Sequence, residues 1–305
     1  DLNSPIVIAH PFDGLVMVAA CDKNVPGLMM AAARINIPTI IVSGGPMLGG
    51  YFKGHKVTVS SVFEAVGTFH AGKMSAEELG GLVNEACPTC GSCAGMFTAN
   101  SMNCLTEAIG LALSGNGTIL ASHSYRKDLF KRAAEQIVKI AKQYYDDDDE
   151  TVLPRSIATK EAFENAMTMD VAMGGSTNTV LHILAMAQSA DVDFTLDDIE
   201  RISHTVPCIC KASPSGEWEI SDVHRAGGIT GILGELDRAG KLHRDVHSID
   251  YKTLEDKLND WDIMRDTCTE EAKQMYLAAP GHIVSPDPWT HTTLFDSLDR
   301  DRVNG

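Results

Sequence analysis

The sequence has few aromatic side chains and no long apolar segment. Phe, Trp and Tyr together make up 6% of its 305 residues. No uninterrupted apolar run reaches the ~18 residues that a membrane-spanning helix requires, and the most apolar stretch, residues 35–45, is interrupted by Pro38. The first five residues, DLNSP, lack the basic start and the long apolar segment of a signal peptide. We therefore expect no membrane partner.

Basic residues are in the minority. The chain carries 25 Lys and Arg against 41 Asp and Glu, for a net charge of −16. Binding to nucleic-acid phosphates requires clustered Lys and Arg, so we expect no nucleic-acid partner. The densest acidic run, residues 146–150, follows a segment with helical periodicity. It is interpreted as a solvated helix end rather than a cation site.

The eight cysteines do not show the spacing of a small disulfide-bonded domain. With 305 residues, 44% of them hydrophobic, the chain is large enough to fold around its own core without disulfides. A reducing compartment, the cytoplasm or an organelle matrix, is therefore the expected location.

A strand, helix, strand unit is predicted near the start of the chain. Residues 14–20 (GLVMVAA) and 39–43 (TIIVS) are short apolar runs with β-branched side chains, which indicates buried parallel strands, and residues 28–35 are expected to form a helix between them. Capping and periodicity predict further helices after Ser75 and at residues 99–113, 125–145, after Thr159, 179–190, after Thr195, 222–239 and 254–261. The predicted fold class is α/β, with a parallel-sheet core and many flanking helices.

Cys21-Asp22-Lys23 follows the first predicted strand directly. The carboxyl ends of strands are where open α/β sheets hold ligands. A thiolate suits an iron–sulfur cluster and a carboxylate suits Mg²⁺, so neighbouring residues would hold two unlike metals. On the tripeptide alone, a buried cysteine beside a surface salt bridge is the better interpretation.

Three more cysteines lie in the segment Cys87-Pro88-Thr89-Cys90-Gly91-Ser92-Cys93. The spacing of three lets two or more sulfurs face one point, and Gly91 would let the backbone approach an inorganic sulfide closely. Two alternatives stay open. Zinc sites also use CxxC spacing, and a cysteine-rich turn packed inside the protein needs no metal.

Several segments, in the same order, resemble the dihydroxy-acid and 6-phosphogluconate dehydratase family. They are residues 21–27 (CDKNVPG), 36–39 (NIPT), 43–47 (SGGPM), 87–103 (CPTCGSCAGMFTANSMN), 174–179 (GGSTNT), 223–228 (VHRAGG) and 234–240 (GELDRAG). The resemblance covers nearly the whole chain. Within the family, the cysteine-rich segment is similar to the dihydroxy-acid dehydratases of branched-chain amino-acid biosynthesis rather than to the sugar-acid dehydratases.

The resemblance implies a role for each of four residues. Cys21 and Cys93 would be ligands of an iron–sulfur cluster, with a 2Fe–2S cluster favoured over a 4Fe–4S cluster. Asp22 would bind Mg²⁺, and Lys23 would bind the same ion through a carbamate, which replaces a cationic amine by an anionic oxygen ligand. The other two cysteines of the cysteine-rich segment are not ligands in the family pattern.

The function that the resemblance implies is a hydro-lyase that dehydrates 2,3-dihydroxy-3-methyl acids to 2-keto acids in valine and isoleucine biosynthesis. Cluster iron would act as a Lewis acid and Mg²⁺ would stabilise the enolate. Ser176, Thr177 and Asn178 precede a predicted helix, where N–H groups and hydroxyls suit a substrate carboxylate; a simple helix cap is the equal alternative. A sugar-acid dehydratase of the same family and a non-catalytic iron–sulfur protein are the other functions left open.

The resemblance also implies how much of the family's architecture is present. Residues 1–279 are expected to form the iron–sulfur and magnesium binding domain, incomplete at its N-terminus, and residues 280–305 a connection toward a C-terminal domain. The family's serine base and further ligands would lie outside this chain. No catalytic residue is therefore identified, and the isolated chain is expected to be inactive. A homodimer or homotetramer is expected.

Overall fold

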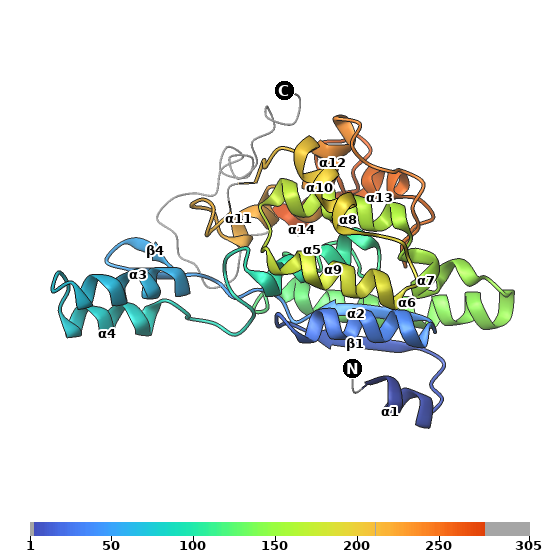
Figure 1. The fold of residues 1–305 in the computed structure, drawn as a ribbon, viewed down its shortest axis with the longest axis horizontal. Helices are drawn as coiled ribbons and strands as arrows, with labels where there is room; N and C mark the ends of the chain where they lie inside the picture. Colours follow the sequence, from blue (N-terminus) through green and yellow to red (C-terminus); the bar gives the residue numbers. More distant parts are fainter. Residues whose placement is uncertain (1–2, 211, 278–305) are drawn as a thin grey trace.

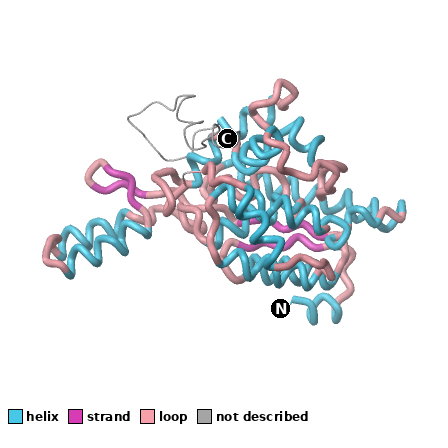
Figure 2. The backbone as a smooth tube through the Cα atoms, turned by 45° about the horizontal axis from the view of Figure 1, so that its top comes forward, coloured by secondary structure: helices cyan, strands magenta, loops and turns pink. Residues whose placement is uncertain are grey.

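The computed structural model describes residues 3–210 and 212–277, and helices dominate it (Figures 1 and 2). These residues form fourteen α-helices, one short 3-10 helix and four short strands. No helix among them combines the length and apolarity needed to cross a membrane. The predicted connection at residues 280–305 lies outside the described residues.

The predicted strand, helix, strand unit is present. β1 (Leu15–Ala19) pairs in parallel with β2 (Thr39–Ser43), and α2 (Asn24–Ile35) connects them. The helix starts four residues earlier than expected. It includes Pro26 in its first turn, where a missing N–H costs nothing because the N–H groups of a first turn have no partner within the helix.

The predicted fold class is confirmed in part: the parallel sheet and the many helices are present, but the sheet is small. In the part of the chain that the structure describes, the parallel sheet has two strands. β2 is buried along its whole length, but β1 is buried on one face alone, with Val16 41% and Val18 56% exposed. Two strands of five residues cannot cover a core of this size, so helices form most of it.

α5 (Thr98–Ile109) lies at the centre of the helical core, and all of its residues are buried. Four helices contact it: α2, α8 (Lys160–Met173), α9 (Asn178–Ser189) and α12 (Gly228–Arg238). Polar side chains of α5 pair inside the protein, as where both Glu107 carboxylate oxygens accept backbone N–H groups of the following loop. Such pairing allows a helix with polar residues on several faces to be buried.

Residues 50–86 form an arm that projects from the helical body (Figure 1). It consists of an antiparallel hairpin and two helices that pack on each other: β3 (Gly50–Phe52), β4 (His55–Val57), α3 (Val59–His70) and α4 (Ala76–Glu85). The capping box predicted at Ser75 is confirmed, since Ser75 Oγ accepts the Glu78 N–H at 3.1 Å and the Glu78 carboxylate accepts the Ser75 N–H at 3.3 Å. The hairpin and α3 were not predicted.

The remaining elements are α1 (Asn3–Ala9), α6 (Ser124–Asp147), η1 (Glu150–Val152), α7 (Pro154–Ile157), α10 (Leu196–Thr205), α11 (Ile220–Arg225), α13 (Leu254–Trp261) and α14 (Glu270–Leu277). The helices predicted at residues 125–145, 179–190, after Thr195 and at 254–261 are confirmed. The single helix predicted at residues 222–239 is wrong. The chain breaks at Gly227, whose φ of 109° ends one helix before α12 begins.

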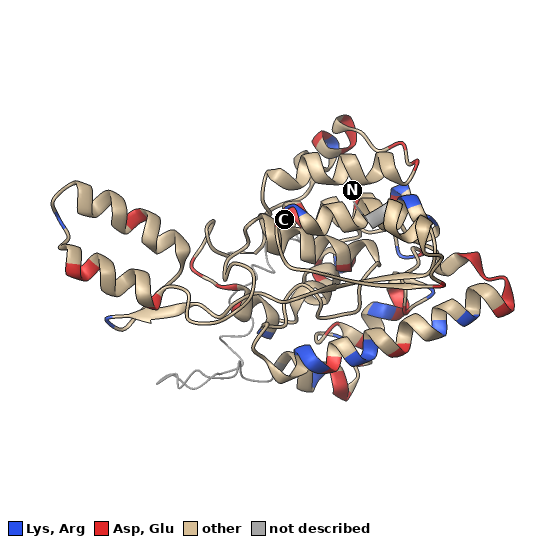
Figure 3. Ribbon diagram, turned by 90° about the horizontal axis from the view of Figure 1, so that it is seen from below, with Lys and Arg blue, Asp and Glu red and all other residues tan. Residues whose placement is uncertain are grey.

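The acidic run at residues 146–150 contains the end of α6, as predicted. Figure 3 shows charged residues of both signs along α6 and acidic residues at its end. Asp148 terminates the helix in the left-handed conformation with φ 55°. Asp149 Oδ1 then accepts the Thr151 N–H at 3.0 Å, which caps η1.

Candidate metal and substrate site

The candidate site starts at the carboxyl ends of β1 and β2. Cys21, Asp22 and Lys23 follow β1 in the short connection before α2. The Cys21 N–H donates to Asn24 Oδ1 at 2.9 Å, which fixes the turn. Lys23 Nζ lies 3.0 Å from Asp22 Oδ2, and Cys21 Sγ lies 3.6 Å from Asp22 Oδ1. The surface salt bridge is therefore present, but the cysteine beside it is exposed rather than buried.

Cys93 reaches this edge through the loop that follows β2. The Gly44 N–H donates to Ala19 O at 2.9 Å, which holds the loop against the end of β1. Farther along the loop, Pro46 and Ser92 form an isolated parallel bridge. In it the Ser92 N–H donates to the loop at 2.9 Å and the Ser92 C=O accepts at 2.7 Å. Cys93 is the next residue and is half-buried.

A buried amide from α5 holds the segment that carries Cys93. Asn100 is 0% exposed, and its Nδ2 donates to Cys93 O and, at 2.7 Å, to Gly95 O. Its Oδ1 accepts the Ser92 hydroxyl at 2.6 Å. Asn100 thus makes three hydrogen bonds to one short segment. Asn100 belongs to the segment of residues 87–103 that resembles the family, and no role for it was predicted.

Gly91 has a different reason to be glycine than the one predicted. Its φ is 133°, and a Cβ there would lie 2.5 Å from Met47 N and 2.6 Å from the Pro46 carbonyl carbon. The space expected to admit an inorganic sulfide is therefore filled by the backbone of the loop that follows β2. Gly91 allows this loop and the cysteine-rich segment to approach each other closely.

The charged groups of the site interact with one another. Burial, together with the nearby groups of Cys21, Cys87 and Asp22, raises the pKa of the Cys93 thiol. The hydrogen bond from Lys23 lowers the pKa of Asp22. Two thiolates and a carboxylate this close would repel one another without a cation, and their soft sulfur and hard oxygen donors suit iron and Mg²⁺ respectively. The donor types thus fit both predicted metals, although no three His, Cys, Asp or Glu side chains of the described residues are arranged to hold a metal ion.

Ser176, Thr177 and Asn178 form a polar loop in front of α9, in contact with α5. Ser176 Oγ lies 2.8 Å from Thr98 Oγ1, and Asn178 Nδ2 donates to the same hydroxyl at 2.9 Å. The Ser176 N–H donates to Ser101 Oγ at 3.0 Å. The helix-cap alternative holds in part, because Ser176 Oγ accepts the Asn178 N–H at 3.3 Å while Thr177 makes no side-chain cap bond. The loop offers hydroxyl, amide and backbone N–H groups, which suit a carboxylate.

A sequence profile of the dihydroxy-acid/6-phosphogluconate dehydratase N-terminal domain matches residues 4–257. The chain belongs to this family. It is 80% identical over 302 residues to a dihydroxy-acid dehydratase of Bifidobacterium adolescentis, an alignment that covers 98% of this chain and 49% of the relative. It is 78% identical over 300 residues to a dihydroxy-acid dehydratase of Bifidobacterium longum, with 97% and 48% covered. The chain spans about half the length of these relatives, and every predicted site residue lies inside the matched region.

His182 lies on the helix that follows the polar loop and is affected by the charges of Lys23 and Asp22; it was not predicted. It lies on α9, one turn after the polar loop, and is 6% exposed with no hydrogen-bond partner at Nε2 among the described residues. Burial and the Lys23 ammonium lower its pKa, while Asp22 acts in the opposite direction. α9 therefore carries the polar loop at its start and, one turn later, a histidine that is affected by the charges of Lys23 and Asp22. The sequence did contain a sign that His182 is buried, because Thr179, His182 and Ile183 have the spacing of one helix face.

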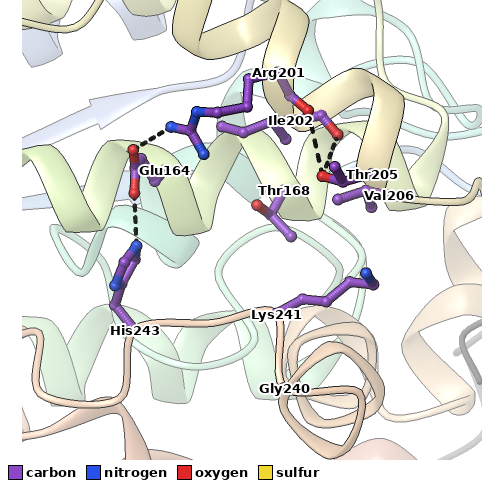
Figure 4. A pocket seen from close by; sticks show the side chains of 9 residues that line it. All are labelled: Glu164, Thr168, Arg201, Ile202, Thr205, Val206, Gly240, Lys241 and His243. Carbon is purple, nitrogen blue, oxygen red and sulfur yellow. Dashed lines mark hydrogen bonds and ion pairs between the residues drawn. The ribbon is translucent and has the colours of Figure 1, made fainter.

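A separate cavity of about 240 Å³ is lined by residues of α8, α10 and the segment after α12 (Figure 4). Glu164 lies there between Arg201 and His243, with Oε1 2.5 Å from Arg201 Nη2 and Oε2 2.6 Å from His243 Nε2. Its carboxylate is thus already paired. The cavity's lining includes no predicted site residue, so we do not place the site there.

Proposed function

We propose that this chain is the metal-binding half of a dihydroxy-acid dehydratase. That enzyme is a hydro-lyase that converts 2,3-dihydroxy-3-methyl acids to 2-keto acids in branched-chain amino-acid biosynthesis. The proposal is supported by the 80% identity to a protein of that name. The observation that carries it for this chain is that Cys93 lies near enough to Cys21 and Asp22, in a segment far away in the sequence, for these two groups to help raise the pKa of its thiol.

In this proposal Cys21 and Cys93 hold a 2Fe–2S cluster, and Asp22 and a carbamate on Lys23 hold Mg²⁺. When bound, the cluster iron supplies a Lewis acid for the leaving C3 hydroxyl, and Mg²⁺ supplies a counter-charge for the developing enolate. Because residues 21 and 22 are adjacent, the backbone fixes how far apart the two metals lie. Asn100 and the Ser92 bridge hold Cys93 in place for the same cluster.

A carbamate on Lys23 is supported by the surroundings of its amine. The Lys23 side chain is 67% exposed and Nζ lies 3.0 Å from Asp22, so CO₂ can reach the amine. Carbamate formation replaces the cation beside Asp22 with an anion. Two neighbouring anionic oxygen groups then need a cation between them, and Mg²⁺ prefers such ligands. Carbamate formation and Mg²⁺ binding would therefore promote each other.

The polar loop in front of α9 binds the substrate carboxylate in this scheme. Ser176, Thr177 and Asn178 offer hydroxyl, amide and N–H groups at the start of a twelve-residue helix, and Thr98 orders two of them. The positive end of the helix dipole favours an anion at this position. His182, on the same helix, lies near enough to Lys23 and Asp22 for their charges to affect its pKa, which supports a substrate site between this helix and the strand end.

The cluster ligands are tested with a matched pair of cysteine variants. In the complete enzyme that contains this chain, reconstituted with iron and sulfide without oxygen, Cys93→Ser should lose the visible cluster absorbance. Cys90→Ser should largely keep it, although Cys90 is only three residues away and its thiol is more exposed than that of Cys93. Equal loss in both variants would overturn the choice of ligand.

The substrate is tested on the same reconstituted enzyme. 2,3-Dihydroxy-3-methylbutanoate should be dehydrated to its 2-keto acid faster than a six-carbon sugar acid, which has no 3-methyl group. The reverse preference would assign the chain to the sugar-acid branch of the family. A cluster that forms without any dehydration of either acid would favour the non-catalytic alternative.

A further inference from the structure

Asp170 is a buried carboxyl group directly beneath the polar loop. It lies on α8, is 4% exposed, and its Oδ2 lies 2.6 Å from Thr179 Oγ1. Its Oδ1 is buried and has no hydrogen-bond partner among the described residues. The Gly175 N–H donates to the Asp170 backbone carbonyl at 2.9 Å, and a Cβ at Gly175 would collide with Asp170 Oδ1. The loop therefore rests on this carboxyl group.

The two oxygens near the Thr179 hydroxyl indicate that the Asp170 carboxyl group carries a proton. Its Oγ1 lies 2.6 Å from Asp170 Oδ2 and 2.6 Å from Ser176 O. A hydroxyl has one hydrogen and can donate one good hydrogen bond, yet two oxygens lie at hydrogen-bond distance. The Ser176 carbonyl can only accept. A second short oxygen contact is favourable only if Asp170 carries a proton and donates it to Thr179 Oγ1.

The surroundings of Asp170 favour its neutral form. Burial raises the pKa of Asp170 to about 7, and the only described interaction that opposes this shift is the Thr179 hydrogen bond. No charged group that the structure describes on α5, α9, α10 or α12 contributes to that pKa. The titratable neighbour on α5 is the Cys104 thiol, which is fully buried and whose own pKa is raised. An ionised Asp170 would leave Oδ1 as a buried, unpaired anionic oxygen.

We propose that Asp170 is a neutral positioning residue that holds the polar loop in its binding conformation. The order of the hydrogen bonds is Asp170 O–H to Thr179 Oγ1, then Thr179 O–H to Ser176 O. Loss of the proton would turn the single Thr179 hydrogen toward the carboxylate and break the hydrogen bond from Thr179 to Ser176 O, which would loosen the loop. This inference rests on the proposed role of the loop in binding the substrate carboxylate.

The position of the proton is tested on the chain itself, without substrate. Buried Glu219 also has a pKa raised to about 7 and gives a band of its own, so the test compares band strengths. The infrared carbonyl band of protonated carboxylic acids that disappears between about pH 6 and about pH 8.5 should be weaker in Asp170→Asn than in the wild type by the contribution of one carboxyl group. Asp193→Asn, which changes an exposed carboxylate after α9, is the matched control and should keep the full band. A band of equal strength in Asp170→Asn and the wild type, or no band at the lower pH, overturns the assignment. This result does not depend on the enzymatic activity.

The positioning role is tested on the complete enzyme through KM for the dihydroxy acid. Wild-type KM should rise about tenfold per pH unit above the pKa of Asp170, with little change in kcat. Asp170→Asn, whose amide can donate to Thr179 as the protonated acid does, should lower the pH dependence of KM. Thr179→Val should raise KM at every pH, and Thr179→Ser should restore it. An Asn variant with the wild-type pH profile, despite a confirmed infrared band, would overturn the positioning role.

Discussion

The Arg126 side chain fixes the loop that brings Cys93 to the strand ends. It is 2% exposed, and its guanidinium donates to three backbone carbonyls: Ser43 O at 2.9 Å, Asn116 O at 3.1 Å, and Ile119 O. A Cβ at Gly45, in the loop that follows β2, would lie 2.8 Å from Arg126 Nε. We predict that Arg126→Lys keeps the buried charge but breaks this connection.

The size of the effect follows from the number of hydrogen bonds. A planar guanidinium reaches three carbonyls in fixed directions, whereas a lysine ammonium in the same space reaches one of them. Two hydrogen bonds from a charged donor are then lost at about 1.5–3 kcal/mol each, so the free energy of unfolding should fall by roughly 3–6 kcal/mol. This is a large part of the ~5–15 kcal/mol that stabilises a typical domain.

Urea unfolding followed by circular dichroism measures this loss as a shift in midpoint at constant slope. Arg201→Lys is the control, because Arg201 is 56% exposed and its ion pairs lie at the surface, where about 0–1 kcal/mol is expected. The alkylation rate of Cys93 should also rise in Arg126→Lys, since its loop is less constrained. A loss no larger than that of the control would refute the reasoning.

Two further predictions concern the carboxylates of the site. Asp22→Asn should keep the cluster absorbance but lower the Mg²⁺ content measured by elemental analysis, and an unchanged Mg²⁺ content would count against a ligand role for Asp22. The second concerns pH: the pKa of Asp170 rises from 3.8 to about 7 on folding, so the folded state binds more protons between these values. The free energy of unfolding should therefore fall as pH rises from about 4 to about 7, by a total on the order of 4 kcal/mol from this group. Asp170→Asn should remove that part of the slope in urea titrations, and equal slopes in both proteins would contradict it.

The strand end that carries the metal residues could be predicted from the sequence. Residues 39–43 are an apolar β-branched run bounded by turn residues, and β2 has the predicted bounds. The strand predicted at residues 14–20 agrees with β1 to within one residue at each end. Cys21 was therefore placed correctly at the carboxyl end of a strand, because the period of apolar residues and the turn residues agreed.

The sheet and the arm could not be predicted in the same way. An apolar run indicates a strand but not how many strands pair with it, and Val16 and Val18 look buried in the sequence although they are exposed. The hairpin of the arm has strands of three residues, too short for a periodic signal. Its turn contains Lys53 and Gly54, both at positive φ, and Gly54 was the one available sign of it.

The arrangement of the candidate site depends on contacts that no local pattern contains. Each of its three loops is held by one buried polar side chain from a helix: Arg126 of α6 holds the loop after β2, Asn100 of α5 holds the Cys93 segment, and Asp170 of α8 holds the polar loop before α9. A loop that moved away would leave a buried donor or acceptor unpaired, at about 1–3 kcal/mol for each group. The chain's own hydrogen bonds thus favour the positions of these loops before any ligand is bound. Metal and substrate would then bind to loops already in place, so little of their binding energy is needed to order the site.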